Sequence, residues 1–95
     1  LRHFRWFETL SIDRRACWWG YYETTPDHQP VVGEMPDAPG WYNACGFSGH
    51  GVQQAAAIGR IVAQEIAGEP AFVDVAPLRI DRFAAGAAHP ERLVV

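Results

Sequence analysis

Three glycines interrupt one short stretch, GFSGHG at residues 46–51, between a run typical of a strand and a run typical of a helix. Glycine lets the backbone turn sharply and approach a ligand closely because it has no Cβ. A strand, a glycine-rich turn and a helix N-terminus present unpaired amides and a positive dipole end, which suits an anionic or planar ligand. The same glycines could instead only shape a tight turn, and the pattern alone leaves both interpretations open. The stretch is neither GxGxxG with a partner acidic residue nor a P-loop, so those two phosphate-binding fingerprints are excluded.

A helix is predicted directly after this stretch. Ser48 can cap it, and Gly68 followed by Glu69-Pro70 predicts its end through a left-handed C-terminal cap. Polar residues occupy the opposite side from an apolar face with helical spacing. That face consists of positions 52, 55, 56, 59, 62, 63 and 66. Because several of these residues are small, whatever packs against the face is expected to lie close.

Three strands are predicted before the helix. Residues 14–24 alternate and are rich in aromatic residues and threonine, which favours a strand. Thr25-Pro26-Asp27 predicts a turn in which the carboxylate bonds the backbone two residues on. Residues 29–35 and 41–47 are expected as the second and third strands, separated by a turn in PDAPG. Residues 1–10 suit a short amphipathic helix, and the tail from Ala71 suits an extended arm with one last turn. The fold class is therefore an α+β fragment: short antiparallel strands followed by one long helix.

Composition favours a packed protein. Of the 95 residues, 48% are hydrophobic and 13% aromatic, which is too much apolar mass for a disordered segment. The net charge of −3 and the absence of a basic block exclude an electrostatic footprint for nucleic acid. No apolar run has the length of a membrane span and no signal-peptide pattern is present, so a soluble, cytoplasmic protein is expected. The chain forms one domain at most, a single segment over residues 1–95.

Other candidate sites carry less signal. Cys17 and Cys45 have no CxxC partner, so neither zinc nor a disulfide is indicated, and both are expected to be reduced, packed thiols. Glu23, Asp27 and His28 could form a metal or acid/base cluster, but turn chemistry with exposed neighbours explains them better, and no metal site is predicted. The aromatic run at residues 18–22 could line a peptide-binding groove, although such a module would not need the long helix.

Four stretches together resemble a known family. They are WWGYYETTPDHQPVVG, GWYNACGFSGHG, the small-residue helix and PLRIDRF. In order and spacing they look like the C-terminal end of the D-amino-acid oxidase type of FAD-dependent oxidoreductases, which includes sarcosine and glycine oxidases. The resemblance covers roughly residues 18–83. It implies that the chain completes a two-domain oxidoreductase whose N-terminal GxGxxG unit is absent from this sequence. The start at Leu1, without an initiator methionine, also suggests the C-terminal piece of a longer protein.

The resemblance implies where FAD would lie. In the family, the loop matching residues 47–52 lies beside the flavin ring, and the following helix directs its N-terminus toward the pyrimidine end. Preoriented amides and a helix dipole stabilise the negative charge that reaches the flavin with the hydride. The cofactor-binding residues implied in this way are Gly46, Phe47, Ser48, Gly49, His50, Gly51, Val52 and Gln53.

Four positions can be compared with the family one at a time. Tyr22 matches a tyrosine that faces the substrate in sarcosine oxidases, so it is the candidate catalytic residue, with a core aromatic as the alternative. His50 is expected to have a structural or orienting role rather than an acid/base role. Gln53 replaces a lysine, which puts a simple carboxylate clamp in doubt. Gly20 replaces the cysteine that tethers flavin in some sarcosine oxidases, so noncovalent FAD is expected.

Two hypotheses follow for function. In the first, the chain supplies the flavin-ring side and part of the substrate cavity of an enzyme that oxidises the carbon–nitrogen bond of an amino acid or secondary amine. In the second, it is a non-catalytic binding or structural fragment. The expected partners are the remainder of the oxidoreductase chain or a second copy, together with a small amine or amino-acid substrate. Self-association is expected because Trp6, Trp18, Trp19 and the helix face would otherwise lack cover.

Overall fold

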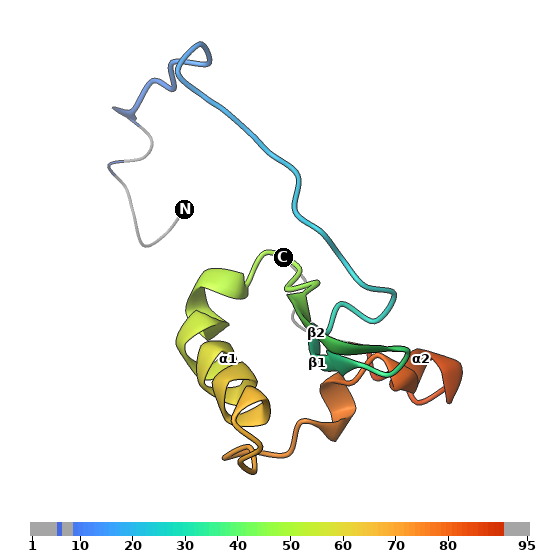
Figure 1. Ribbon diagram of the computed structural model, residues 1–95. Coiled ribbons are helices and arrows are strands. Elements are labelled where there is room, and N and C mark those ends of the chain that lie inside the picture. The colour runs from blue at the N-terminus through green and yellow to red at the C-terminus, as the bar shows by residue number, and fades with distance from the viewer. Residues whose placement is uncertain (1–5, 7–8, 91–95) are drawn as a thin grey trace.

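The computed structural model describes residue 6 and residues 9–90. The helix predicted over residues 1–10 falls mostly outside these described residues. The described elements occur in the order β1, β2, α1, η2 and α2 (Figure 1). The two strands, α1 and the C-terminal segment lie together, whereas the described N-terminal residues extend away from them as an arm.

The strand predicted at residues 14–24 is wrong. Asp13 to Ala16 form a turn, in which the Ala16 amide donates to the Asp13 carbonyl at 3.1 Å. Residues 17–25 follow without strand pairing to any described residue. Alternation and β-branched or aromatic residues favour extended backbone, but a strand also needs a neighbour for its amides and carbonyls. Trp18 and Tyr21 are 90% and 93% exposed, so residues 17–21 have neither a paired edge nor a packed face among the described residues.

The second and third strands are confirmed as an antiparallel pair. β1 spans Val31–Met35 and β2 spans Ala38–Cys45, with Val31 opposite Cys45 and an irregularity in the register between Glu34 and Met35. β2 therefore begins three residues earlier than predicted. The tight turn needs only Pro36 and Asp37, so Ala38 already lies opposite Met35.

The long helix and its C-terminal cap are confirmed, but not its N-cap or its packed face. α1 spans Gly51–Ile66. Gly68 follows it with a positive φ of 71°, and its amide donates a hydrogen bond to the Glu65 carbonyl, which forms the predicted C-terminal cap. His50 occupies the N-cap position, whereas the Ser48 hydroxyl donates to the Gly46 carbonyl at 3.4 Å.

Ile58 and Ile61 are the buried residues of α1, and neither belongs to the predicted apolar face. Val52 and Ile66, which do belong to it, are 88% and 61% exposed. α1 carries apolar residues on more than one side, so spacing alone could not decide which side meets the sheet.

The core forms where β1, α1 and the tail meet. Val32, Ile58, Ile61 and Val75 are its buried residues, with Phe47, Val62, Ala71 and Leu78 packed around them. The tail is more helical than expected, because η2 spans Ala76–Leu78 and α2 spans Asp81–Ala84.

The two cysteines are free and exposed, so the prediction that they are packed is wrong. Within the described part of the chain, no helix combines the length and apolar character that crossing a bilayer needs.

Candidate functional site

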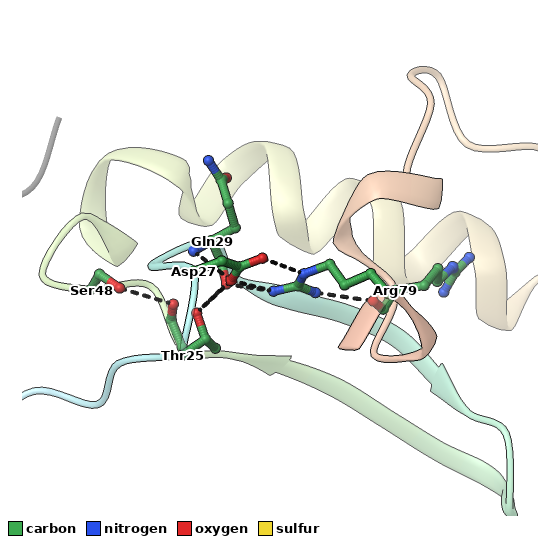
Figure 2. A network of polar contacts seen from close by, with 7 residues as sticks. Thr25, Asp27, Gln29, Ser48 and Arg79 are labelled. Atoms are coloured by element: carbon green, nitrogen blue, oxygen red, sulfur yellow. Dashed lines mark hydrogen bonds and ion pairs between the residues drawn. The ribbon is translucent and has the colours of Figure 1, made fainter. Parts of the chain in front are cut away.

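A buried ion pair joins the turn before β1 to α2. The Nε atom of Arg82 donates to Oδ2 of Asp27 at 2.8 Å, and Nη2 donates to Oδ1 at 3.0 Å (Figure 2). Asp27 is 1% exposed and Arg82 is 5% exposed. Nη2 and Nη1 also donate to the carbonyls of Gln29 and Arg79, at 2.8 and 3.0 Å. The guanidinium is therefore bonded to acceptors from both segments, which is what a buried arginine requires.

Asp27 has further partners within its own turn. The Gln29 amide donates to Oδ1 at 3.2 Å, which confirms the predicted bond to the backbone two residues on. The Thr25 hydroxyl lies 3.0 Å from Oδ1 and 2.7 Å from the Gln29 carbonyl. Hydrogen bonds from the Arg82 guanidinium, the Gln29 amide and the Thr25 hydroxyl hold the pKa of Asp27 far below its usual range. Asp27 is thus the turn carboxylate that was expected, and it is also a buried structural anion.

Thr25 connects this ion pair to the glycine loop, here defined as residues 46–51. A Cβ placed on Gly46 would lie only 2.5 Å from the Thr25 methyl carbon, and Gly46 has a φ of 75°. Glycine at this position is therefore required both by the close approach of Thr25 and by the backbone conformation. The shape of the loop at Gly46 thereby depends on a residue that the buried ion pair fixes.

Two further residues before the turn contact the loop. The Gly46 amide donates to Oε1 of Glu23 at 3.1 Å. The Tyr22 ring lies beside Gly49, with its nearest carbons 3.5 Å from where a Cβ of that glycine would stand. Residues 22–25 therefore run along residues 46–49, although 23 positions separate Glu23 from Gly46 in the sequence.

The structure divides the predicted cofactor-binding residues into an inner and an outer group. Gly46 and Ser48 are buried, and Phe47 packs against the core. The outer group runs from Gly49 to Gln53 and is exposed or partly exposed. The outer group is therefore the part of the loop that a ligand could reach in this chain.

The loop continues into α1 through a series of backbone bonds. The His50 amide donates to the Phe47 carbonyl at 2.9 Å, and the Gln53 amide donates to the His50 carbonyl at 3.1 Å. A Cβ on Gly51 would lie 3.2 Å from Cβ of Phe47, so this glycine has an internal packing reason of its own. Because the Gln53 amide already donates to the His50 carbonyl, its exposed side chain is the group that Gln53 can offer a ligand.

A second ion pair ties the tail to α1 and β1. Nη1 of Arg79 donates to both carboxylate oxygens of Glu65, at 2.7 and 2.9 Å, and to the Val32 carbonyl at 3.3 Å. Burial works to raise the pKa of Glu65, but bonds from the Arg79 guanidinium and the Glu34 amide lower it overall. Among the described residues, no group of three or more His, Cys, Asp or Glu side chains could hold a metal ion.

Sequence reasoning brought Tyr22 and the glycine loop into one hypothesis, and the structure places them side by side. It missed the roles of Arg82 and Glu23. Arg82 lies 55 positions from Asp27, and no local pattern pairs residues at that distance. The available signal was that TPD and IDRF occur within one resemblance, which could have suggested an acid–base pair between them.

Comparisons with known proteins find similar sequences. A family model described as FAD dependent oxidoreductase matches residues 3–65. The FAD-dependent oxidoreductase domain-containing protein 1 of Bos taurus is 41% identical over 91 residues, which cover 94% of this chain and 18% of that protein. A D-amino acid dehydrogenase of Paramagnetospirillum magneticum is 36% identical over 76 residues, covering 77% of this chain and 17% of that protein.

Hydrogen cyanide synthase subunit HcnC of Pseudomonas protegens is 30% identical over 77 residues, covering 81% of this chain and 18% of that protein. The chain thus spans less than a fifth of the length of these relatives. No solved structure matches it. The family match includes the Asp27 turn and the glycine loop and extends over more than half of the chain. The chain therefore belongs to the FAD-dependent oxidoreductase family.

Proposed function

We propose that the complete protein oxidises the carbon–nitrogen bond of an amino acid or secondary amine, with this chain forming the flavin-ring side of the site. The family membership supports the use of FAD, and the two relatives named D-amino acid dehydrogenase, each 36% identical, support an amino-acid substrate. The observation that carries the proposal is the contact between Tyr22 and Gly49. It joins the candidate substrate residue to the candidate flavin loop across 27 positions of sequence, from 22 to 49.

The residues present fit a planar group that takes on negative charge. Gly49 to Gln53 lie at the open side of the loop and at the start of α1, where the amides of the first turn lack acceptors within the helix. The positive end of the helix dipole lies at the same place. Amides held in this way favour negative charge without moving, which is the property that hydride transfer to a flavin needs.

When bound, FAD supplies the hydride acceptor. The residues of this chain would orient the cofactor and stabilise the negative charge that reaches it. The amides of Gly49, Gly51 and Val52 would donate hydrogen bonds to the cofactor's polar edge, because those of His50 and Gln53 already bond backbone carbonyls. Tyr22, half-exposed beside Gly49, would line the space in which the substrate lies. Gln53 would offer an uncharged amide, so substrate carboxylate recognition falls to other residues of the complete protein. FAD is expected to be bound noncovalently through this segment.

Gly49 and Gly40 provide a matched test of the loop. Their φ angles are 85° and 84°, so alanine should cause the same backbone strain at either position. A Cβ on Gly40 would meet nothing within 4 Å, and one on Gly49 would meet only the Tyr22 ring at ordinary contact distance. Gly49→Ala and Gly40→Ala would each be made in the complete protein. The flavin-to-protein ratio and the melting temperature would be measured on each.

The proposal predicts that both variants lose similar thermal stability and that only Gly49→Ala loses flavin. Equal flavin-to-protein ratios in the two variants would show that residues 46–51 only form a turn and do not bind the cofactor. A purified complete protein without flavin absorbance, and without capacity to bind added FAD, would favour the non-catalytic alternative.

A further inference from the structure

Glu23 holds the first amide of the glycine loop. Its Oε1 atom accepts the Gly46 N–H at 3.1 Å, from a segment 23 residues earlier in the chain. Hydrogen bonds from its own backbone amide and from the Gly46 and Phe47 amides hold the pKa of Glu23 below its usual value. A carboxylate that bonds backbone amides in its ionised form makes stronger hydrogen bonds than a neutral acceptor does.

The position of this contact matters because of the backbone that follows it. Positive φ angles occur at Gly46, Ser48 and Gly49, at 75°, 51° and 85°, within four residues. Ser48 is not a glycine, so its left-handed conformation must be maintained by its surroundings. The directions of the later loop amides depend on these backbone angles. A bond that holds the Gly46 amide therefore restrains the backbone from which they follow.

Other residues also contact the loop. Thr25 lies against Gly46 through a methyl group, and the Tyr22 ring lies beside Gly49. Glu23 provides a directional bond with charge. It is also exposed, so removing its carboxylate should leave the core around Val32 and Ile58 unchanged.

We propose that Glu23 is a positioning residue for the flavin, whose carboxylate fixes the inner end of the glycine loop so that the outer amides face the cofactor. This inference rests on the proposed function of the loop. Glu23 itself need not touch FAD. It acts through the Gly46 amide.

Glu34 offers a matched control. Its Oε1 atom accepts the Gly40 amide at 2.6 Å, so it makes the same kind of bond to a glycine of similar φ, within the β1–β2 hairpin. Glu23→Ala, Glu23→Gln and Glu34→Ala would be made in the complete protein. Backbone hydrogen exchange would be followed in the apoprotein by mass spectrometry, and the FAD dissociation constant would be measured by titrating the apoprotein with FAD.

Glu23→Ala should speed exchange in peptides that span the loop by about tenfold and raise the FAD dissociation constant at least about fivefold. Glu23→Gln keeps an acceptor and should recover most of both effects. Glu34→Ala should speed exchange only in the hairpin and leave FAD affinity unchanged.

Unchanged loop exchange in Glu23→Ala would overturn the inference. Faster loop exchange with unchanged FAD affinity would also overturn it, because the loop would be ordered by Glu23 without positioning flavin. The inference and the proposed function can fail separately. If Gly49→Ala loses flavin while Glu23→Ala keeps it, the loop still binds FAD and only the role of Glu23 is refuted.

Discussion

Replacing Arg82 by methionine should lower the free energy of unfolding more than the same replacement of an exposed arginine does. The change leaves the Asp27 carboxylate 1% exposed and without its cation, although Thr25 and Gln29 still donate to it. Breaking a buried pair from one side typically costs 3–5 kcal/mol, and the two remaining donors place the expected loss near the lower end, at about 3 kcal/mol. Arg60→Met is the control, since Arg60 is exposed and its guanidinium carbon lies over the Phe72 ring, 4.4 Å from the centroid.

The loss should depend on pH in a defined direction. Asp27 has a pKa below its usual 3.8 when Arg82 is present, so its stabilising contribution is full above that value and is lost as pH falls below it. Without Arg82, burial dominates and the folded-state pKa should rise above the unfolded value. The variant then gains stability as the carboxyl takes up a proton. The difference in unfolding free energy between wild type and Arg82→Met should therefore narrow from about pH 7 to about pH 4.5.

Urea unfolding of the complete protein, followed by tryptophan fluorescence at several pH values, measures this difference. Adding Asp27→Asn to Arg82→Met should restore part of the loss at neutral pH, because the unpaired charge is then gone. A loss below about 1 kcal/mol, or one that stays constant with pH, would refute the assignment of the pair as a buried structural contact.

Three further predictions concern the loop, the cofactor and the surface. Gly46→Ala should cost about 2 kcal/mol or more in unfolding free energy, and less in a Thr25→Ser background that lacks the opposing methyl but keeps the hydroxyl; equal costs in both backgrounds would mean that the methyl contact is unimportant. Acid precipitation of the flavin-loaded complete protein should leave the yellow colour in the supernatant, because Gly20 offers no thiolate; colour in the pellet would show a covalent link. The 95-residue chain alone should self-associate through exposed aromatic residues such as Trp18 and Trp19, and light scattering that gives a monomer mass across a hundredfold dilution would contradict this.

Local chemistry in the sequence predicted the elements that local chemistry controls. The turn at Asp27, the hairpin, the long helix and its glycine cap follow from residues within a few positions of one another. The arm at residues 17–25 was predicted as a strand because its composition favours extended backbone, but pairing depends on a neighbour that composition does not specify. The packed face of α1 was assigned to the wrong side because Ile58 and Ile61 compete with a second apolar face of small residues.

In the candidate site, too, some features could be predicted from the sequence and others could not. The glycine loop and Tyr22 could be proposed from motif resemblance, and the structure adds that they lie in contact. The connection from Arg82 through Asp27 and Thr25 to Gly46 could not be predicted, because its first and last steps join residues from different segments. Such contacts depend on how the whole chain packs, which spacing within one segment does not reveal.

The ion pair between Asp27 and Arg82 also constrains the order of events during synthesis. Gly46 of the loop lies against Thr25, and the Thr25 hydroxyl is hydrogen-bonded to Asp27. The cation that neutralises Asp27 belongs to Arg82, 55 residues later in the chain. Until Arg82 has left the ribosome, the Asp27 turn lacks its counterion and cannot be buried stably. The glycine loop therefore reaches its final shape only after α2 is made. A cofactor that depends on this loop then binds only after nearly all of the chain described here has been synthesised.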